Sequence, residues 1–140
     1  MNFLVTGGAG FIGSHVCERL LGAGHAVWAY DDLNNFYDPQ IKRRNLRNIQ
    51  SLAKPFEFVH GDLVDRVALE DLIASVKFDQ VIHLAARAGV RPSLAEPALY
   101  QRVNVEGTVN VLEAARLHGV KKITLASSSS VYGVNAKVPF

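Results

Sequence analysis

Cysteine, methionine and tryptophan each occur only once in this chain, and neither sign of charge predominates. The single cysteine, Cys17, cannot form an internal disulfide. We interpret it as a small core residue, and its isolation fits a reducing compartment. The formal net charge of +2 gives no reason to expect a nucleic acid or a membrane surface as a partner. We therefore predict a protein without disulfides that binds neither.

Long apolar runs and a secretory leader are also missing. No stretch approaches the roughly 18 apolar residues of a membrane-spanning helix. The N-terminus passes directly into an apolar segment, without a charged n-region or a cleavage site. The sequence therefore predicts a cytoplasmic protein, and we predict no metal site. Its 140 residues, 49% of them apolar, are enough for one domain with a hydrophobic core.

Glycine, in contrast, is concentrated at one turn near the N-terminus. An apolar run at residues 3–6 is followed by Gly7, Gly10 and Gly13, and a helical pattern covers residues 12–21. Glycines allow a tight turn and the close approach of a phosphate, and a helix N-terminus presents free N–H groups to an anion. The G-x-x-G-x-x-G spacing differs from the common G-x-G-x-x-G fingerprint. The turn therefore predicts a pyrophosphate site, and the alternative is a glycine-rich turn that holds no ligand.

An acidic pair strengthens the prediction of a dinucleotide. Asp31 and Asp32 end the next apolar run, at residues 26–30. A carboxylate about 20 residues after such glycines is where a ribose diol is hydrogen-bonded. The strand, the glycines, the helix and the acids together therefore predict a dinucleotide-binding site.

Apolar runs alternate with helical patterns along the whole chain. The predicted strands are residues 3–6, 26–30, 56–60, 80–84 and 123–126. The predicted helices are residues 12–21, 40–52, 67–76 and 97–118, with Asp38 and Asp65 as N-caps, Pro39 at a first helical position and Gly119 as the last stop. This alternation predicts an α/β fold, a doubly wound parallel sheet of the Rossmann type. Right-handed crossovers give the strand order 3-2-1-4-5.

The sequence ends soon after the fifth predicted strand, at Val138-Pro139-Phe140. A two-half dinucleotide fold usually has a sixth strand, and an enzyme of this kind also needs a lobe for its substrate. We therefore expect residues 1–140 to be a dinucleotide-binding domain, the N-terminal part of a longer protein, truncated before the substrate lobe.

In open parallel sheets, ligands bind at the carboxyl ends of the strands. Asp62 follows the third strand and is placed to reach an adenine amino group; a turn or helix-cap carboxylate is the alternative. Ala85 and Ala86 follow the fourth strand, where small side chains allow a flat cofactor to approach or serve ordinary packing. Four consecutive serines at 127–130 follow the fifth strand. They are candidates for hydrogen bonds to a reacting sugar, or they form an ordinary loop.

Basic side chains gather in the second predicted helix, at Lys42, Arg43, Arg44 and Arg47. We interpret this cluster as a solvated helix face, because charged runs on helices usually face water.

Motifs that span almost the whole chain resemble one family. They are residues 6–13, 31–34, 61–63, 83–86, 103–108 and 127–133. Together they are similar to the extended short-chain dehydrogenase/reductase family, whose members use NAD. Residues 31–38, 88–91 and 127–133 most resemble nucleotide-sugar 4-epimerases, and among these the UDP-glucuronate 4-epimerase group.

The resemblance implies a role for each matching residue. NAD would contact Gly7, Gly10, Phe11, Ile12 and Gly13 at its pyrophosphate, Asp31 with Asn34 or Asn35 at its ribose, Asp62 and Leu63 at its adenine, Ala85 and Ala86 along its length, and Asn104 at its nicotinamide side. Ser128 would be the active-site serine. Ser129, Ser130 and Arg91 would face a sugar carboxylate, although a surface ion pair is an equal alternative for Arg91.

The family's catalytic Tyr-x-x-x-Lys pair is missing from this sequence. Tyr132 is followed four residues later by Ala136. In the family the pair lies somewhat beyond the position of residue 140, so truncation accounts for its absence. We therefore expect the 140-residue chain alone to be catalytically silent and only marginally stable.

For the longer protein, the resemblance implies an NAD-dependent epimerase. It would invert C4 of a UDP-sugar, UDP-glucuronate in particular, through a transient 4-keto intermediate. Nucleotide-sugar 4,6-dehydratases and UDP-glucuronate decarboxylases begin with the same oxidation and remain alternatives. A non-catalytic NAD-binding module is an alternative of another class. The family also implies a homodimer, formed through a helix bundle that includes residues 97–118.

Overall fold

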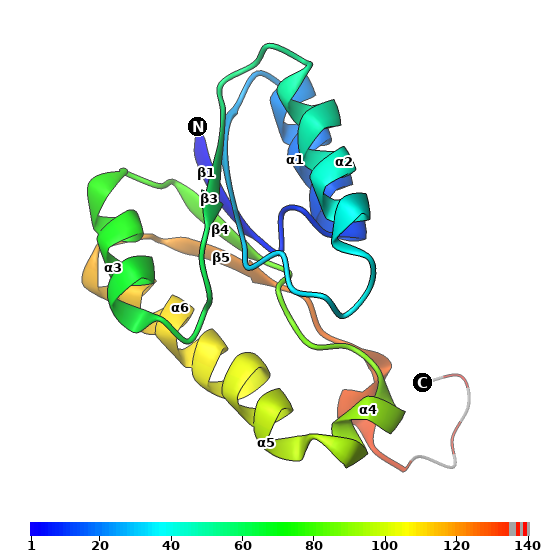
Figure 1. Ribbon diagram of the computed structural model, residues 1–140. Coiled ribbons are helices and arrows are strands. Elements are labelled where there is room, and N and C mark those ends of the chain that lie inside the picture. The colour runs from blue at the N-terminus through cyan, green and yellow to red at the C-terminus, as the bar shows by residue number, and fades with distance from the viewer. Residues whose placement is uncertain (135–136, 138, 140) are drawn as a thin grey trace.

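A single parallel sheet forms the centre of the computed structural model, which describes residues 1–134, 137 and 139 (Figure 1). Its five strands are β1 (Asn2–Thr6), β2 (Ala26–Asp31), β3 (Phe56–His60), β4 (Gln80–His83) and β5 (Lys122–Leu125). They lie in the order β3-β2-β1-β4-β5, all neighbours parallel. The predicted Rossmann-type order is therefore confirmed, and each predicted strand lies within about one residue of its observed bounds.

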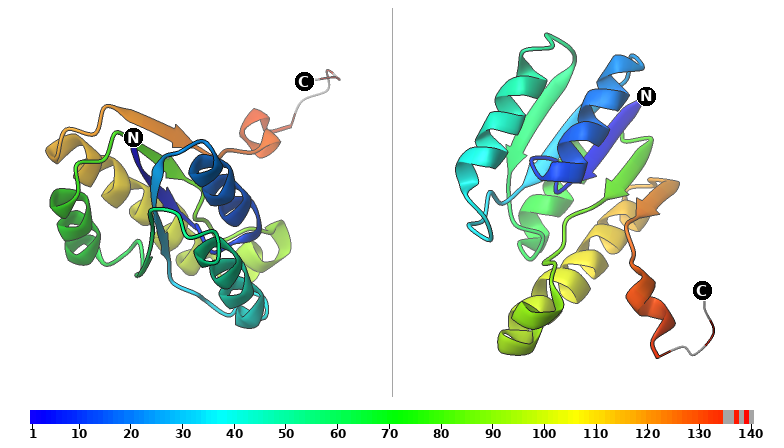
Figure 2. Two further views of the ribbon diagram at one scale, coloured as in Figure 1. Left: turned by 90° about the horizontal axis from the view of Figure 1, so that it is seen from above. Right: turned by 90° about the vertical axis from the view of Figure 1, so that its right-hand side faces the viewer.

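Helices cover both faces of the sheet (Figures 1 and 2). The helices α1 (Phe11–Gly22) and α2 (Pro39–Gln50) pack together on one face, whereas α3 (Arg66–Ser75) and α6 (Gly107–Leu117) pack together on the other. Asp38 accepts a hydrogen bond from the Gln40 amide at 2.9 Å, and Asp65 accepts one from Ala68 at 3.1 Å. Both predicted N-caps are thus confirmed, and they fix where α2 and α3 begin.

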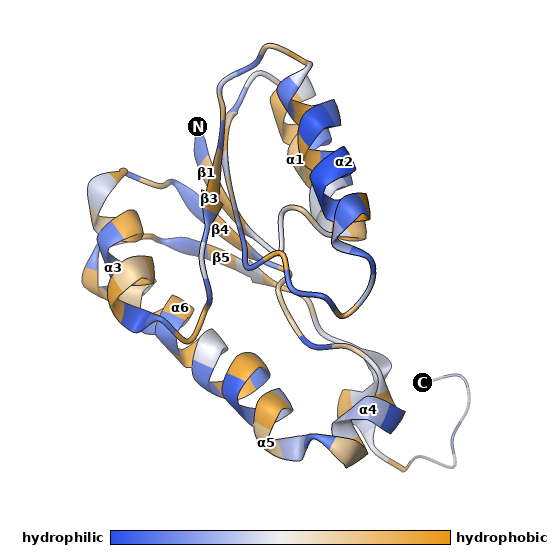
Figure 3. Cartoon of the chain, in the orientation of Figure 1, coloured by the Kyte–Doolittle hydropathy of each residue, from blue (hydrophilic) through white to orange (hydrophobic). Residues whose placement is uncertain are grey.

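The sheet has a separate hydrophobic core on each face. Side chains alternate between the two faces of a strand, so Leu4 of β1 joins the core under α3 and α6 while Val5 joins the core under α1 and α2. Cys17 is fully buried in the second core, as predicted, and burial raises the pKa of its thiol to about 12. In Figure 3, α2 is largely hydrophilic, whereas hydrophobic residues recur along α6.

The predicted helix at residues 97–118 is not one regular helix. It consists of α5 (Pro97–Tyr100), a π-helical segment η1 (Gln101–Glu106) and α6. Two short helices were not predicted: α4 (Val90–Ala95) and the 3₁₀ turn η2 (Ser129–Tyr132). Neither has the repeated apolar spacing that predicts a helix.

Within the described residues, no helix is both long and apolar enough to cross a membrane. Ala136, Val138 and Phe140, on which the expectations about the missing lysine and the chain end depend, lie outside the described residues.

Candidate functional site

A pocket lies at the carboxyl ends of β1 to β4, the edge where open parallel sheets bind their ligands. It is lined by most of the predicted cofactor residues, namely Gly7, Gly10, Phe11, Ile12, Gly13, Asp31, Asn34, Asp62, Leu63, Ala85 and Ala86. The same pocket is lined by three further strand-end residues, Asp32, Gly61 and Leu84, and by residues that were not predicted as site residues, namely Tyr30, Phe36, Tyr37, Lys42, Arg87, Ala88 and Val103. The structure therefore brings the predicted set together from distant parts of the sequence.

The glycine turn brings backbone segments so close together that a Cβ would not fit between them. Gly7 has φ +69°, and a Cβ there would lie 2.9 Å from the backbone nitrogen of Ala85. A Cβ on Gly13 would overlap the carbonyl oxygen of Gly7. Directly after this turn, α1 begins with no side-chain cap, so the N–H groups of its first turn remain available at the pocket. Such a helix start attracts an anion.

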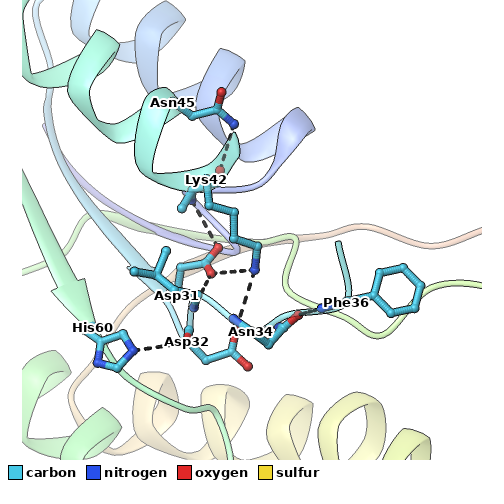
Figure 4. A network of polar contacts seen from close by, with 9 residues as sticks. Asp31, Asp32, Asn34, Phe36, Lys42, Asn45 and His60 are labelled. Atoms are coloured by element: carbon cyan, nitrogen blue, oxygen red, sulfur yellow. Dashed lines mark hydrogen bonds and ion pairs between the residues drawn. The ribbon is translucent and has the colours of Figure 1, made fainter. Parts of the chain in front are cut away.

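Asp31 is the most strongly held acidic group of the pocket (Figure 4). Its Oδ2 accepts a hydrogen bond from the Ala9 amide at 3.2 Å, and its Oδ1 accepts one from the Leu33 amide at 2.9 Å. The ammonium of Lys42 lies 2.9 Å from the same Oδ1 and 3.7 Å from Oδ1 of Asp32. The Asp31 side chain is 3% exposed. The carboxylate thus connects the glycine turn, the end of β2 and helix α2.

The interpretation of Lys42 as part of a solvated face is wrong. Its side chain is only 7% exposed, whereas Arg43, Arg44 and Arg47 are exposed as predicted. Lys42 shares the buried side of α2 with Leu46 and Ile49. That spacing of four and three residues puts a cation in phase with the apolar stripe. This phase is the signal that could have identified Lys42 from the sequence.

Two buried polar atoms at the pocket have no partner. Among the described residues, these are the hydroxyl of Tyr37 and Nε of Arg87, and both residues line the pocket. Desolvation raises the pKa of Tyr37, opposed by the nearby Lys42, whose ammonium lies 5.6 Å from the centre of the tyrosine ring. Buried polar groups are usually hydrogen-bonded, so unpartnered ones in a pocket point to a polar ligand.

The end of β3 forms the far wall of the pocket. Gly61 packs against the ring of Tyr30, whose hydroxyl donates to the Asp62 carbonyl oxygen at 2.9 Å. Burial, with the nearby carboxylates of Asp65, Asp62 and Asp32, raises the pKa of Tyr30 to about 12. The Asp62 carboxylate accepts the Val64 amide at 3.1 Å and so shapes the turn, while its residue remains exposed at the pocket. Both interpretations of Asp62 are therefore compatible with its position.

Asn104 lies behind the pocket rather than in its lining. Its Oδ1 accepts the Arg87 amide at 2.7 Å, and its Nδ2 donates to the Arg87 carbonyl oxygen at 3.0 Å. Both atoms of the amide side chain are therefore engaged with the backbone of Arg87. Asn104 meets the pocket through that segment and not directly.

The predicted substrate residues are not part of the pocket. Ser128, Ser129 and Ser130 follow β5 and are all exposed, and Ser128 Oγ accepts the Ser130 amide at 3.2 Å. Arg91 is exposed in α4 and does not line the pocket either. The structure thus assembles the predicted cofactor residues other than Asn104 and leaves the predicted substrate residues outside the pocket.

Comparison with known proteins agrees with this arrangement. Residues 4–140 match the family described as GDP-mannose 4,6 dehydratase. A probable UDP-glucuronate 4-epimerase from Rhizobium meliloti (strain 1021) is 43% identical over 140 residues, which are 100% of this chain and 41% of that protein. UDP-glucuronate 4-epimerase 1 from Arabidopsis thaliana is 46% identical over 141 residues, 100% of this chain and 32% of that protein.

Solved structures of 4-epimerases superpose closely on the chain. UDP-glucose 4-epimerase from Bifidobacterium longum, crystallised with NAD+ and UDP, has a TM-score of 0.89 and 34% identity over 100% of this chain and 41% of its own. UDP-glucose 4-epimerase from Thermotoga maritima, crystallised with UDP-glucose, has a TM-score of 0.84 and 36% identity, covering 99% of this chain and 41% of its own. The chain thus spans about two fifths or less of the relatives it matches.

Proposed function

Because the chain belongs to the GDP-mannose 4,6 dehydratase family of extended short-chain dehydrogenases/reductases, we propose that its pocket binds NAD. The observation that carries this proposal is the joint lining of one pocket by the uncapped start of α1 and by Asp31. The free N–H groups of α1 suit the pyrophosphate, and the held carboxylate suits the ribose diol. Neighbours of known structure were crystallised with NAD, which supports the choice of ligand.

The remaining walls fit the other parts of NAD. Leu63 and Asp62 lie on the β3 side, where adenine would rest, while Ala85 and Ala86 lie on the β4 side along the cofactor. Residues 1–140 would then constitute the NAD-binding domain of a longer protein. When bound, NAD supplies a reversible hydride acceptor.

The activity proposed for the longer protein is inversion of C4 in a UDP-sugar, specifically UDP-glucuronate. Relatives named as UDP-glucuronate 4-epimerases support this substrate. Ser128 would hydrogen-bond the reacting C4 oxygen and orient its proton transfer. Ser129 and Ser130 would donate to the sugar carboxylate, with Arg91 facing the same anion. Hydroxyl donors suit a carboxylate that must turn within the site, since neutral hydrogen bonds are weaker than a bidentate ion pair.

A 4,6-dehydratase is the second candidate, because the matching family carries that description. Both reactions begin with oxidation at C4, so the residues of this chain serve either one. The products separate them: an epimerase keeps the C6 substituent, whereas a dehydratase loses water across C5 and C6.

We propose a cytoplasmic homodimer as the working form. The support is an apolar stripe along η1 and α6, where Val105, Val109 and Leu112 are 55%, 50% and 42% exposed. Their spacing of four and three residues puts them on one side of the helix, as in helix bundles.

Calorimetric titration of NAD into the 140-residue chain tests cofactor binding. The expected result is saturable binding of one NAD per chain. A folded chain that does not bind NAD would disprove the proposal, and circular dichroism on the same sample shows whether the chain is folded. The chain alone is expected to be catalytically silent, and measurable epimerisation by it would overturn that expectation.

The substrate is tested on a protein of the relatives' full length. UDP-glucuronate and UDP-glucose are compared as substrates by kcat/KM, with UDP-glucuronate expected to be preferred. Equal or better turnover of UDP-glucose would disprove the carboxylate assignment in favour of a neutral-sugar epimerase. The Ser128→Ala variant should lower kcat more than it raises KM, because its hydrogen bond strengthens as the C4 oxygen changes charge.

A further inference from the structure

A chain of hydrogen bonds runs behind the β4 side of the pocket. His83 ends β4 and is 4% exposed. Its Nδ1 lies 2.6 Å from Thr6 Oγ1, and its Nε2 lies 3.0 Å from Thr108 Oγ1. The Thr108 hydroxyl in turn lies 2.7 Å from the carbonyl oxygen of Asn104. Burial lowers the pKa of His83 from its ordinary value and so favours the neutral imidazole.

The partners in this series of hydrogen bonds determine where each proton lies. A carbonyl oxygen only accepts, so Thr108 donates to Asn104 and its oxygen accepts from His83 Nε2. A neutral imidazole has one N–H, so Nδ1 accepts the hydroxyl proton of Thr6. The lone pairs of Thr6 Oγ1 accept the amide of Ala85 at 3.3 Å and that of Leu84 at 3.2 Å, and the Leu84 amide is shared with the Thr6 carbonyl oxygen, also at 3.2 Å. Each proton on the ring and on the two hydroxyls thus has one assignment.

Both ends of this series of hydrogen bonds hold the same short stretch of backbone, segment 84–87. Thr6 holds it at the amides of Leu84 and Ala85. At the other end, the Asn104 side chain holds the amide and the carbonyl oxygen of Arg87. Every residue of segment 84–87 lines the pocket, and Arg87 brings a buried Nε without a partner to it.

From this closed arrangement we propose that His83, as the neutral Nε2–H tautomer, is a positioning residue that holds segment 84–87 in place as one wall of the cofactor pocket. The proposal rests on the proposed binding of NAD. His83 itself does not line the pocket; it lies behind the wall and acts through Thr6, Thr108 and Asn104.

The other tautomer does not fit the same partners. An Nδ1–H group would point at Thr6 Oγ1, whose two lone pairs already accept backbone amides. A bare Nε2 would face the oxygen of Thr108, whose proton is already donated to Asn104. Both contacts would become repulsive, and segment 84–87 would lose support at both ends. The tautomer and the position of the wall are therefore coupled.

Three threonine variants test the proposal. Thr108→Val keeps the side-chain shape and removes the hydroxyl that joins His83 to Asn104. Thr108→Ser restores that hydroxyl and serves as the rescue. Thr124→Val is the matched control, since Thr124 is an exposed residue of β5 that bonds Gln80 and does not line the pocket.

Three measurements are made on the chain and its variants. Long-range ¹H–¹⁵N spectra report the tautomer of His83, which should be Nε2–H. Hydrogen exchange of the Arg87 amide should accelerate in Thr108→Val and remain unchanged in Thr108→Ser and Thr124→Val. Calorimetric titration should show NAD binding about fivefold to tenfold weaker in Thr108→Val alone, the loss expected for one hydrogen bond.

Several results would overturn the proposal. One is an Nδ1–H or protonated ring in the wild-type chain at pH 7, which requires no variant. Another is a folded Thr108→Val chain with unchanged Arg87 exchange and unchanged NAD affinity. If Thr108→Val does not fold, Thr108→Ser decides the proposal. Loss of the Nε2–H signal of His83 in that variant, or Arg87 amide exchange faster than in the wild type, counts against it. If the wild type binds no NAD, the proposed function fails, while tautomer and exchange still decide the positioning of segment 84–87.

Discussion

The carboxyl edge of the sheet has two contrasting ends. Around β1 and β2, the Asp31 side chain is 3% exposed and has two backbone amides and the Lys42 ammonium as partners. After β5, Ser128 is exposed, and its hydroxyl accepts only from the nearby Ser130 amide among the contacts within the described residues. One end is thus preorganised by tertiary contacts and the other by a local turn. The proposed cofactor site therefore has more structural support than the proposed substrate serines.

The largest effect is expected from breaking the better-supported end. Asp31→Ala leaves Lys42 buried beside Asp32 alone and removes the acceptor for the Ala9 and Leu33 amides. We expect the free energy of unfolding to fall by about 3 kcal/mol, at the low end for a broken buried pair. Urea unfolding measures it. Adding Lys42→Met should recover much of the stability without restoring NAD affinity, and a stable Asp31→Ala chain would show that the network is dispensable.

The preference for NAD over NADP tests the same contrast, because the charged side chains around β1 and β2 determine this preference. Asp31 and Asp32 outnumber the single Lys42 ammonium, so a 2′-phosphate should be repelled. We expect NAD to bind at least about tenfold more tightly than NADP, which is about 1.4 kcal/mol. Lys42→Met should widen the preference and Asp31→Ala should narrow it. Titrations with both cofactors measure this, and equal or tighter binding of NADP contradicts it.

A pH series tests how His83, which ends β4 between the two regions, contributes to stability. Burial lowers the pKa of His83, so the unfolded chain binds its proton more readily than the folded one. Stability from this residue is therefore complete above the unfolded pKa of about 6.5 and declines as the pH falls below it. We expect the free energy of unfolding of the wild type to fall as the pH drops from 7.5 to 5.5. His83→Gln should remove this part of the dependence, and the same slope in both chains would exclude His83 as its source.

The smallest effect is expected at the β5 end, where the same substitution can be compared with one at the other end. Ser14 is 4% exposed, and its hydroxyl donates to the Phe11 carbonyl oxygen at 3.0 Å, so Ser14→Ala should cost about 1 kcal/mol. Ser128→Ala should stay within about 0.5 kcal/mol. Thermal or urea unfolding of the two variants measures the loss of stability in each. Equal costs would remove the contrast between the two ends.

Local patterns predicted the architecture because they depend on neighbours in sequence. Strand and helix periodicity, together with Asp38 and Asp65 as caps, were enough for the parallel sheet and its order. The glycines and Asp31 likewise predicted residues that do line one pocket. Their roles toward NAD remain predictions.

The parts that were missed depend on tertiary contacts. Lys42 is buried because Asp31, from another element, compensates its charge. Arg87 reaches the pocket because Asn104 holds its backbone across 17 positions of sequence. The exposed placement of Arg91 and Ser128 likewise follows from how α4 and η2 sit, and neither element has a periodic signature. Apart from the phase of Lys42 with the apolar stripe of α2, these contacts leave no trace in the local spacing of residues.

The π-helical segment η1 has a consequence for helical phase. Residues four apart in an α-helix drift by about 40° around its axis, so Tyr100, Asn104 and Thr108 would spiral away from a common target. The wider turn of a π-helix advances less per residue and offsets that drift. Tyr100 can then donate to the Ala88 carbonyl oxygen at 2.6 Å while Asn104 reaches Arg87 and Thr108 reaches His83. Deleting one residue within 101–106 would leave a helix of ordinary pitch. Its three polar side chains would then no longer lie on one side of the helix.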